Sequence, residues 1–240
     1  MFIVIFEVQP KADRFDDYLA LAKQLKPKLE ATDGFIDNER FRSKRDARRM
    51  LSVSTWRDEK AVVRWRTHGE HHHAQEKGRF DVFEDYHLRV GEITADTHPP
   101  QGMTIDQVRF DETAVGMAKT ATITELTPVA HATVSAQSDQ LPTHLGLAPD
   151  PQGLVALDVF ESITNPGKLA LLASWRNSDA AATWSPTKPD AVASLRHRRA
   201  RVIRDYGMFE RREAPQYYPD VVPGRSAGME QSGAPRVRCG

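Results

Sequence analysis

An internal repeat is the feature that most constrains the fold of this chain, because residues 2–93 match residues 120–212. The offset between matching positions is nearly constant, at 118 to 120. Each copy carries two tryptophans nine residues apart, in a chain with only four tryptophans. We therefore predict a duplicated domain. The matching positions are Glu7 and Glu125, Gly34 and Gly153, Phe41 and Phe160, Trp56 and Trp175, Trp65 and Trp184, and the pairs Asp85-Tyr86 and Asp205-Tyr206.

Hydrophobic periodicity indicates the order of elements in the first copy. A continuous apolar run of strand length opens it, and apolar residues at helical spacing follow. The whole order is β-α-β-β-α-β, which is the arrangement of ferredoxin-like domains and places the chain in the α+β class. The predicted strands cover residues 2–8, 35–43, 50–56 and 86–93, and the predicted helices cover 12–31 and 58–67.

A four-stranded sheet with both helices on one face leaves an apolar face that must find a partner. The second copy can supply this partner within one chain, so we expect the two sheets to face each other across a pseudo-two-fold axis. The expected division is a first domain with the site over 1–95, a connector over 96–119 that can add a strand at 106–110, a degenerate second domain over 120–215, and a flexible tail over 219–240.

Composition excludes several classes of function. Thirty-three Lys and Arg balance thirty-three Asp and Glu, so nothing favours nucleic-acid binding. Cys239 is the only cysteine, which excludes an intramolecular disulfide and a cysteine zinc or iron–sulfur site. The apolar opening is far too short to span a membrane. We expect a cytoplasmic protein without a nucleic-acid or membrane partner, for which a homodimer of the two-domain chain is possible.

The first copy contains a series of short motifs: Glu7-Val-Gln-Pro, Asp33-Gly-Phe-Ile, Glu39-Arg-Phe-Arg-Ser, Ser54-Thr-Trp-Arg-Asp-Glu, the helix ending at Trp65, His73-Ala-Gln-x-x-Gly-Arg79, and Asp85-Tyr86. With these motifs the first copy resembles the antibiotic biosynthesis monooxygenase (ABM) family over essentially all of residues 2–93, and the second copy resembles it more weakly. The resemblance implies a dimeric α/β barrel, usually made by two chains and here by two halves of one. The family includes cofactor-independent oxygenases that act on polycyclic phenols, haem-degrading enzymes, and proteins without an assigned activity.

A histidine cluster after Trp65 carries the chemical signal, because it holds four of the nine histidines: His68, His71, His72 and His73. If the helix continues past Gly69, then Trp65, His68 and His72 share one face, which we expect to point into the barrel. Imidazole titrates near neutrality and can take the proton of an acidic phenol, whose anion can pass an electron to dioxygen. We therefore predict His68, His72 and Trp65 as catalytic residues, and His71 and His73 as the most dispensable of the cluster for catalysis.

The leading hypothesis is an ABM-type monooxygenase that oxidises a small aromatic or polycyclic phenolic substrate with dioxygen in the barrel cavity and requires no cofactor. A closed apolar chamber would keep reactive intermediates away from water. The candidate substrate-binding residues are Glu7, Trp56, Arg79 and His73. The competing interpretation of the two tryptophans is core packing, because both recur in the second copy.

Haem binding or haem degradation is the alternative function, with His72 or His73 as the axial ligand. Haem-degrading relatives use an asparagine on the first strand, where this chain has Glu7, and this difference counts against haem cleavage of that type. A metal ion on His68 and His72 lacks an evident third ligand, so we predict no metal site. A non-catalytic ligand-binding module is the remaining alternative. In the second copy, prolines and a single histidine, His197, replace the cluster, which predicts that the second site is lost or altered.

Overall fold

The structure, a computed structural model, describes residues 1–129 and 140–221. The predicted tail therefore lies outside the described residues from position 222 onward. In the first half, the predicted strands and helices are confirmed to within a few residues at their ends. Its elements are β1 (Phe2–Pro10), α1 (Phe15–Glu30), β2 (Phe35–Ser43), β3 (Met50–Trp56), α2 (Glu59–Thr67), α3 (Gly69–Lys77), the π-helical turn η1 (Gly78–Val82) and β4 (Phe83–Asp96).

The second half has four strands of similar length but much shorter helices. Its described helices have four and five residues, against sixteen for α1 in the first half. Among the described residues, only the first half therefore has long helices that can form the wall of a cavity. The elements are β5 (Thr120–Pro128), α4 (Leu141–His144), β6 (Leu154–Ser162), β7 (Leu169–Trp175), α5 (Ser178–Ala182) and β8 (Val192–Gly207).

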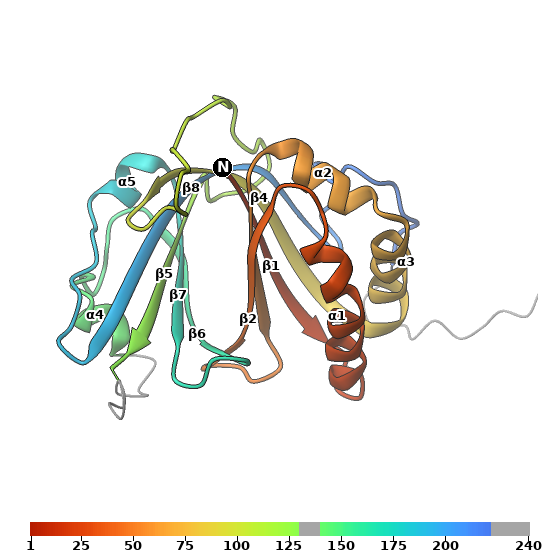
Figure 1. Cartoon of the computed structure of the whole chain (residues 1–240), viewed down its shortest axis with the longest axis horizontal. Coiled ribbons are helices and arrows are strands. Elements are labelled where there is room, and N and C mark those ends of the chain that lie inside the picture. Colours follow the sequence, from red (N-terminus) through yellow and green to blue (C-terminus); the bar gives the residue numbers. More distant parts are fainter. Residues whose placement is uncertain (130–139, 222–240) are drawn as a thin grey trace, which may run out of the picture.

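The eight strands of the described residues form one closed antiparallel barrel in the order β1-β3-β2-β6-β7-β5-β8-β4 (Figure 1). The two halves meet at two seams, a long one between β4 and β8 and a short one of three residue pairs between β2 and β6. Every strand therefore pairs with a neighbour on each side, although β2 and β6 pair along only part of their length. The α+β class with a large antiparallel sheet is confirmed.

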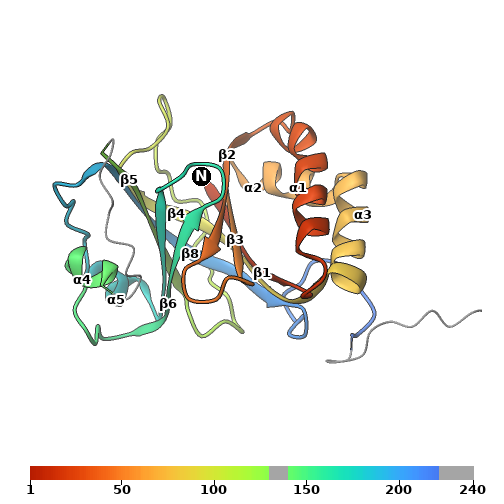
Figure 2. The same ribbon diagram turned by 90° about the horizontal axis from the view of Figure 1, so that it is seen from below.

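The helices lie on the outside of the barrel and are distributed unequally. Helices α1, α2 and α3 gather on the side of the first half, whereas α4 and α5 lie on the opposite side (Figure 1, Figure 2). Along β1, Ile3 and Ile5 face the interior, and the alternate residues Val4 and Phe6 face the helices. This alternation separates a core inside the barrel from a second apolar layer beneath the helices.

Apolar side chains from both halves fill the barrel interior. Strands β1, β2, β3 and β4 of the first half and β5, β6, β7 and β8 of the second contribute to one cluster. The interior is therefore a core shared by the halves. Its members are Met1, Ile3, Ile5, Phe41, Leu51, Val53, Ile93, Ala121, Ile123, Phe160, Ala170, Leu172, Ala200 and Val202.

Local contacts recur in the two halves at an offset of 119 residues. Gly34 and Gly153 both have a positive φ, at 86° and 80°, and an added Cβ on either would lie 2.6 Å from an alanine Cβ. Asp58 and Asn177 each cap a short helix by accepting a backbone N–H at 2.8 Å. The same turn and the same cap therefore position the second helix of each half.

Two arginines lie inside the barrel, and each makes the same kind of contacts. Arg89 donates to the Glu7 carboxylate of its own half and, at 2.6 Å, to Ser174 Oγ of the other half. Arg198 donates to the Glu125 carboxylate of its own half and, at 2.7 Å, to Thr55 Oγ1 of the first half. Both arginines are at least 98% buried, so these contacts replace part of their hydration, while the Nε atom of each has no hydrogen-bond partner among the described residues.

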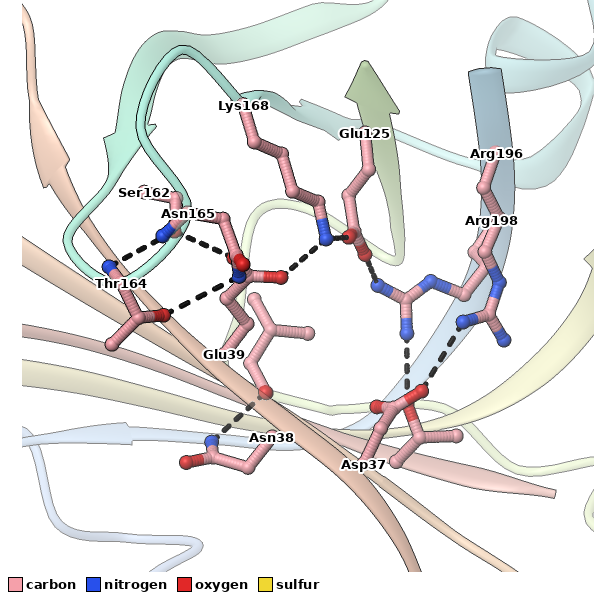
Figure 3. Close-up of polar contacts among 12 residues, drawn as sticks. Asp37, Asn38, Glu39, Glu125, Ser162, Thr164, Asn165, Lys168, Arg196 and Arg198 are labelled. Carbon is pink, nitrogen blue, oxygen red and sulfur yellow. Dashed lines mark hydrogen bonds and ion pairs between the residues drawn. The ribbon is translucent and has the colours of Figure 1, made fainter. Parts of the chain in front are cut away.

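The same pattern extends to the seam between β2 and β6. Lys168 lies between Glu125 and Glu39, and the Nζ–Oε2 distance to Glu125 is 2.6 Å (Figure 3). In the other half Arg49 lies between Glu7, at 2.8 Å, and Asp158, at 3.8 Å. Salt bridges thus connect the interior charges across the seam.

Strand registers correct one sequence match. Phe2 pairs with Glu92 and Thr120 pairs with Arg201, so the last strands of the two halves correspond at an offset of 109. The predicted match of Asp85-Tyr86 with Asp205-Tyr206 is therefore wrong. The second half is ten residues shorter between its third and fourth strands, where the first half has α3 and η1.

The connector forms no strand at 106–110, contrary to expectation. The carboxylate of Glu92 accepts the backbone N–H groups of Val108 and Arg109, so these groups are satisfied without a strand partner. No helix within the described residues is both long and apolar enough to cross a bilayer.

The first prediction concerns the interior arginines. Arg89→Met and Arg198→Met should each lower the free energy of unfolding by about 3–5 kcal/mol, because each leaves a buried carboxylate without its main partner. Urea unfolding at pH 7 measures the loss. Arg48→Met, at an exposed arginine, is the matched control. Glu7→Leu combined with Arg89→Met should recover part of the stability, and a double variant less stable than Arg89→Met alone would contradict this account.

Candidate functional site

A cavity of about 220 Å³ lies between the outer face of the first-half strands and helices α1, α2 and α3. The histidine face was expected to point into the barrel, but the shared core fills the space that the strands enclose, and the cavity lies in the layer between the sheet and the helices. Strand β8 and the chain that follows it complete the cavity wall. Most of the lining is apolar, and it includes Val4, Phe6, Ala22, Leu25, Leu29, Val62, Phe83, Leu88 and Val90.

The second helix of the first half ends earlier than the predicted histidine face requires. Helix α2 stops at Thr67, His68 has an extended backbone with ψ 127°, and α3 begins at Gly69. Glycine is a poor helix former, and here it follows directly after the break. Trp65, His68 and His72 therefore do not share one helix face.

His71, which the sequence marked as dispensable, lines the cavity beside Trp65. The two rings are stacked with their centroids 4.2 Å apart and an interplanar angle of 15°. The His71 Nδ1 atom lies 2.8 Å from the Trp65 carbonyl oxygen, which can only accept. We assign the proton to Nδ1 on this contact, which leaves the lone pair on Nε2.

Burial lowers the pKa of His71 to about 4, and the nearby His68 and His72 lower it further, while the bond to the Trp65 carbonyl opposes the shift. The imidazole is therefore neutral at pH 7. A neutral ring in an apolar cavity can accept a hydrogen bond from a bound molecule through Nε2. It can take a proton only when the anion that forms stays beside it, because burial disfavours an imidazolium on its own.

The other predicted histidines lie outside the cavity lining. His72 and His73 are exposed, and the His72 ring stacks at 6.0 Å against Tyr218. His68 lies at the break between α2 and α3, and its Nδ1 is buried without a hydrogen-bond partner among the described residues. No group of three or more possible metal-binding side chains occurs in residues 1–129 and 140–221.

Two predicted substrate-binding residues are part of the packed structure. Glu7 faces the barrel interior, on the opposite side of the sheet from the cavity, where it pairs with Arg89. Trp56 is fully buried, and its Nε1 donates to Ser54 Oγ at 2.9 Å. Neither side chain lines the cavity.

Arg79, the third predicted substrate-binding residue outside the cluster, holds the segment after β8, which we call the C-terminal strap (residues 208–221). It is 2% exposed and donates to the Met208 carbonyl at 2.7 Å and to the Pro219 carbonyl at 3.2 Å. These bonds fix the strap against the first half. Four strap residues line the cavity: Arg211, Pro215, Gln216 and Tyr218.

Sequence reasoning missed this strap as part of the site. It follows the last strand of the second copy, and neither the repeat nor the histidine cluster points to it. The only signal in the sequence is the concentration of Tyr217, Tyr218 and the arginines 211 and 212 just before the composition changes.

In the second half, the face that corresponds to the cavity is packed with side chains. Trp184 is 6% exposed, and its ring lies 6.3 Å from Trp175. His197 packs edge-on against Trp184 at 5.3 Å, and burial lowers its pKa to about 4. Leucines of α4 and the strands surround this group.

Comparisons with known proteins match both the first half and the whole chain. Residues 1–77 match the sequence profile of the family described as "Antibiotic biosynthesis monooxygenase". A protein from Pyricularia oryzae named "Jasmonate monooxygenase ABM" is 44% identical over 224 residues, which cover 91% of this chain and 99% of that protein.

Among solved structures, an aldoxime dehydratase in complex with butyraldoxime is similar with a TM-score of 0.52 and 13% identity, over 84% of this chain and 80% of that one. This likeness extends to the fold alone. An anthrone oxidase-like protein aligns with a TM-score of 0.34 and 12% identity, over 90% of this chain and 96% of that one.

The second prediction concerns acid stability. The folded pKa of His71, about 4, lies below its unfolded value of 6.5, so the unfolded chain binds more protons between these two values. Stability therefore falls as the pH drops from 6.5 towards 4. Urea unfolding at pH 7 and pH 5 should show a loss that is about 1–2 kcal/mol smaller in His71→Gln than in the unmodified chain. His98→Gln, at an exposed histidine, is the control. If His71→Gln and the unmodified chain lost equal stability between pH 7 and pH 5, the burial of a neutral His71 would be contradicted.

Proposed function

The chain belongs to the antibiotic biosynthesis monooxygenase family, and we propose that it is a monooxygenase acting on a small, largely apolar molecule in the cavity beneath α1, α2 and α3. The observation that carries this proposal is the mostly apolar cavity with a neutral imidazole, His71, stacked on Trp65 in its wall. Such a cavity holds an apolar molecule and offers it one imidazole as a hydrogen-bond acceptor.

We also propose that the two halves take the places of the two chains in a dimeric barrel built from tandem ferredoxin-like repeats. The strand order β4-β1-β3-β2 in the first half and β8-β5-β7-β6 in the second supports this. So do the matching glycine turns, helix caps and interior arginines. The second half then acts as a built-in partner that completes the barrel and one wall of the cavity.

The reaction places one oxygen atom of dioxygen in the substrate and reduces the other to water, with two electrons and two protons. An acidic phenol can give its proton to His71 and supply electrons from its own anion, whereas a substrate with only unactivated C–H bonds needs an external reductant such as a reduced nicotinamide. The name of the relative makes jasmonate the first substrate to test. The aromatic lining by Tyr18, Phe83 and Tyr86 favours a phenolic substrate as the second candidate.

Haem is not used in this proposal, because the residues predicted to bind it do not meet at the cavity. His72 and His73 are exposed outside the lining, and Glu7 faces the barrel interior. His71 is the imidazole of the lining, and one of its faces is covered by Trp65. Titration with ferric haem tests this point, and a saturable one-to-one Soret shift that is lost in one histidine variant would restore the haem hypothesis.

The third prediction is an oxygen-dependent turnover. Purified protein should consume dioxygen with jasmonate or with a polycyclic phenol, each measured with and without a reduced nicotinamide. With ¹⁸O₂ the product should carry one labelled oxygen atom, which mass spectrometry detects. His71→Ala should lower the rate about a hundredfold or more, as expected for the loss of a proton acceptor.

Variants separate the candidate histidines. His98→Ala, remote from the cavity, should keep the rate. A loss confined to His72→Ala would favour the residue predicted from sequence over His71. Turnover that is unchanged in His71→Ala, or a product without labelled oxygen, would contradict the proposal.

A further inference from the structure

The cavity wall carries an excess of positive charge. Four arginines line it, and Glu59 is the only acidic residue among the lining residues of the described chain. The Glu59 carboxylate is already paired with Arg109 Nη1 at 2.6 Å. A cavity that is otherwise mostly apolar therefore presents several guanidinium groups and no free carboxylate. The four arginines are Arg40, Arg66, Arg204 and Arg211.

Three of these arginines, Arg66, Arg204 and Arg211, line the same cavity as the buried Tyr206, and the Arg211 guanidinium lies 5.9 Å from the centre of the Tyr206 ring. Burial raises the pKa of Tyr206 to about 12, and the charges of Arg66, Arg211 and Arg204 each oppose the shift. The hydroxyl therefore stays protonated and can donate a hydrogen bond. The three arginines come from α2, the C-terminal strap and β8, so residues of both halves meet at this point.

These guanidinium groups have no acidic partner. Within residues 1–129 and 140–221, no carboxylate oxygen lies within 4.0 Å of Arg66, Arg204 or Arg211. Arg66 Nε is buried, with no hydrogen-bond partner in the described part of the chain. All three arginines are half-buried. A guanidinium that is partly withdrawn from water and has no acidic partner favours a carboxylate, which it binds through parallel charge-assisted hydrogen bonds.

Neutral groups hold Arg211 in place. It donates to the Tyr86 hydroxyl at 2.6 Å and to the Gln216 carbonyl at 3.0 Å, and its guanidinium lies 5.4 Å from the centre of the Tyr218 ring. The charge is thus positioned but not neutralised. Asp111, an acidic residue that feels the charge of Arg204, is exposed and already binds Arg109.

We propose that Arg66, Arg204 and Arg211, with the Tyr206 hydroxyl, form a carboxylate-binding subsite, and that the cavity takes a small apolar molecule ending in a carboxylate. The apolar lining would hold the body of the molecule and the arginines its acid group. This inference rests on the proposed function for the fate of the bound molecule, but the binding itself can be measured without turnover.

The fourth prediction compares an acid with its own ester. Isothermal titration calorimetry with jasmonic acid, methyl jasmonate, and two other apolar carboxylic acids with their methyl esters should show at least one acid that binds about tenfold or more tightly than its ester. Arg66→Met and Arg204→Met should lower the affinity for that acid about tenfold or more and leave the affinity for its ester unchanged. Arg212→Met is the matched control, since this neighbour of the strap arginine is exposed and paired with Glu210.

Several results would overturn the subsite. These are equal affinity for every acid and its ester, binding of no acid in the set, equal losses of affinity for acid and ester in the arginine variants, or displacement of the acid by millimolar inorganic phosphate.

Oxygen consumption is then measured with the same compounds. Turnover of an acid at a rate that the arginine substitutions do not change would remove the subsite and leave the monooxygenase proposal intact. Acid-selective binding without any oxygen uptake would keep the subsite and remove the monooxygenase proposal.

Discussion

The buried arginines of the barrel interior determine how the two halves fit together. Arg89 and Arg198 each bind a glutamate of their own half and a hydroxyl of the other half. A charge removed from water needs all of these partners, so a shifted register between the halves would leave charges unpaired. Apolar packing around the arginines stabilises any closed arrangement of the two halves. The contacts of the arginines stabilise the one register that pairs all of the buried charges.

Because the interior is filled in this way, the cavity lies outside the barrel. The strands of the first half present their alternate residues to α1, α2 and α3, and the cavity forms in that second layer. The same layer in the second half is closed by Trp184 and the leucines around it. The second half contributes instead through β8 and the C-terminal strap, which Arg79 holds in place.

Much of the fold could be predicted from the sequence, because alternation and helical spacing are local signals. The strands over 35–43 and 50–56 were predicted to the residue. The site was harder. The predicted histidine face assumed an unbroken helix, and the extended backbone of His68 turned His71 towards Trp65 instead. The strap and the arginines of β8 meet the cavity only through long-range packing, which no local pattern records.

A single chain containing both halves removes a constraint that two identical chains would impose. In a symmetric pair, every substitution that fills one cavity fills the other, and every extension that closes one side closes both. Here one half keeps long helices and a cavity, while the other has short helices, a packed face and a terminal strap. The positive cluster around Tyr206 depends on this difference, because Arg66 comes from the first half and Arg204 and Arg211 from the second. A cavity with a neutral imidazole and a positively charged wall can therefore develop without duplicating either feature.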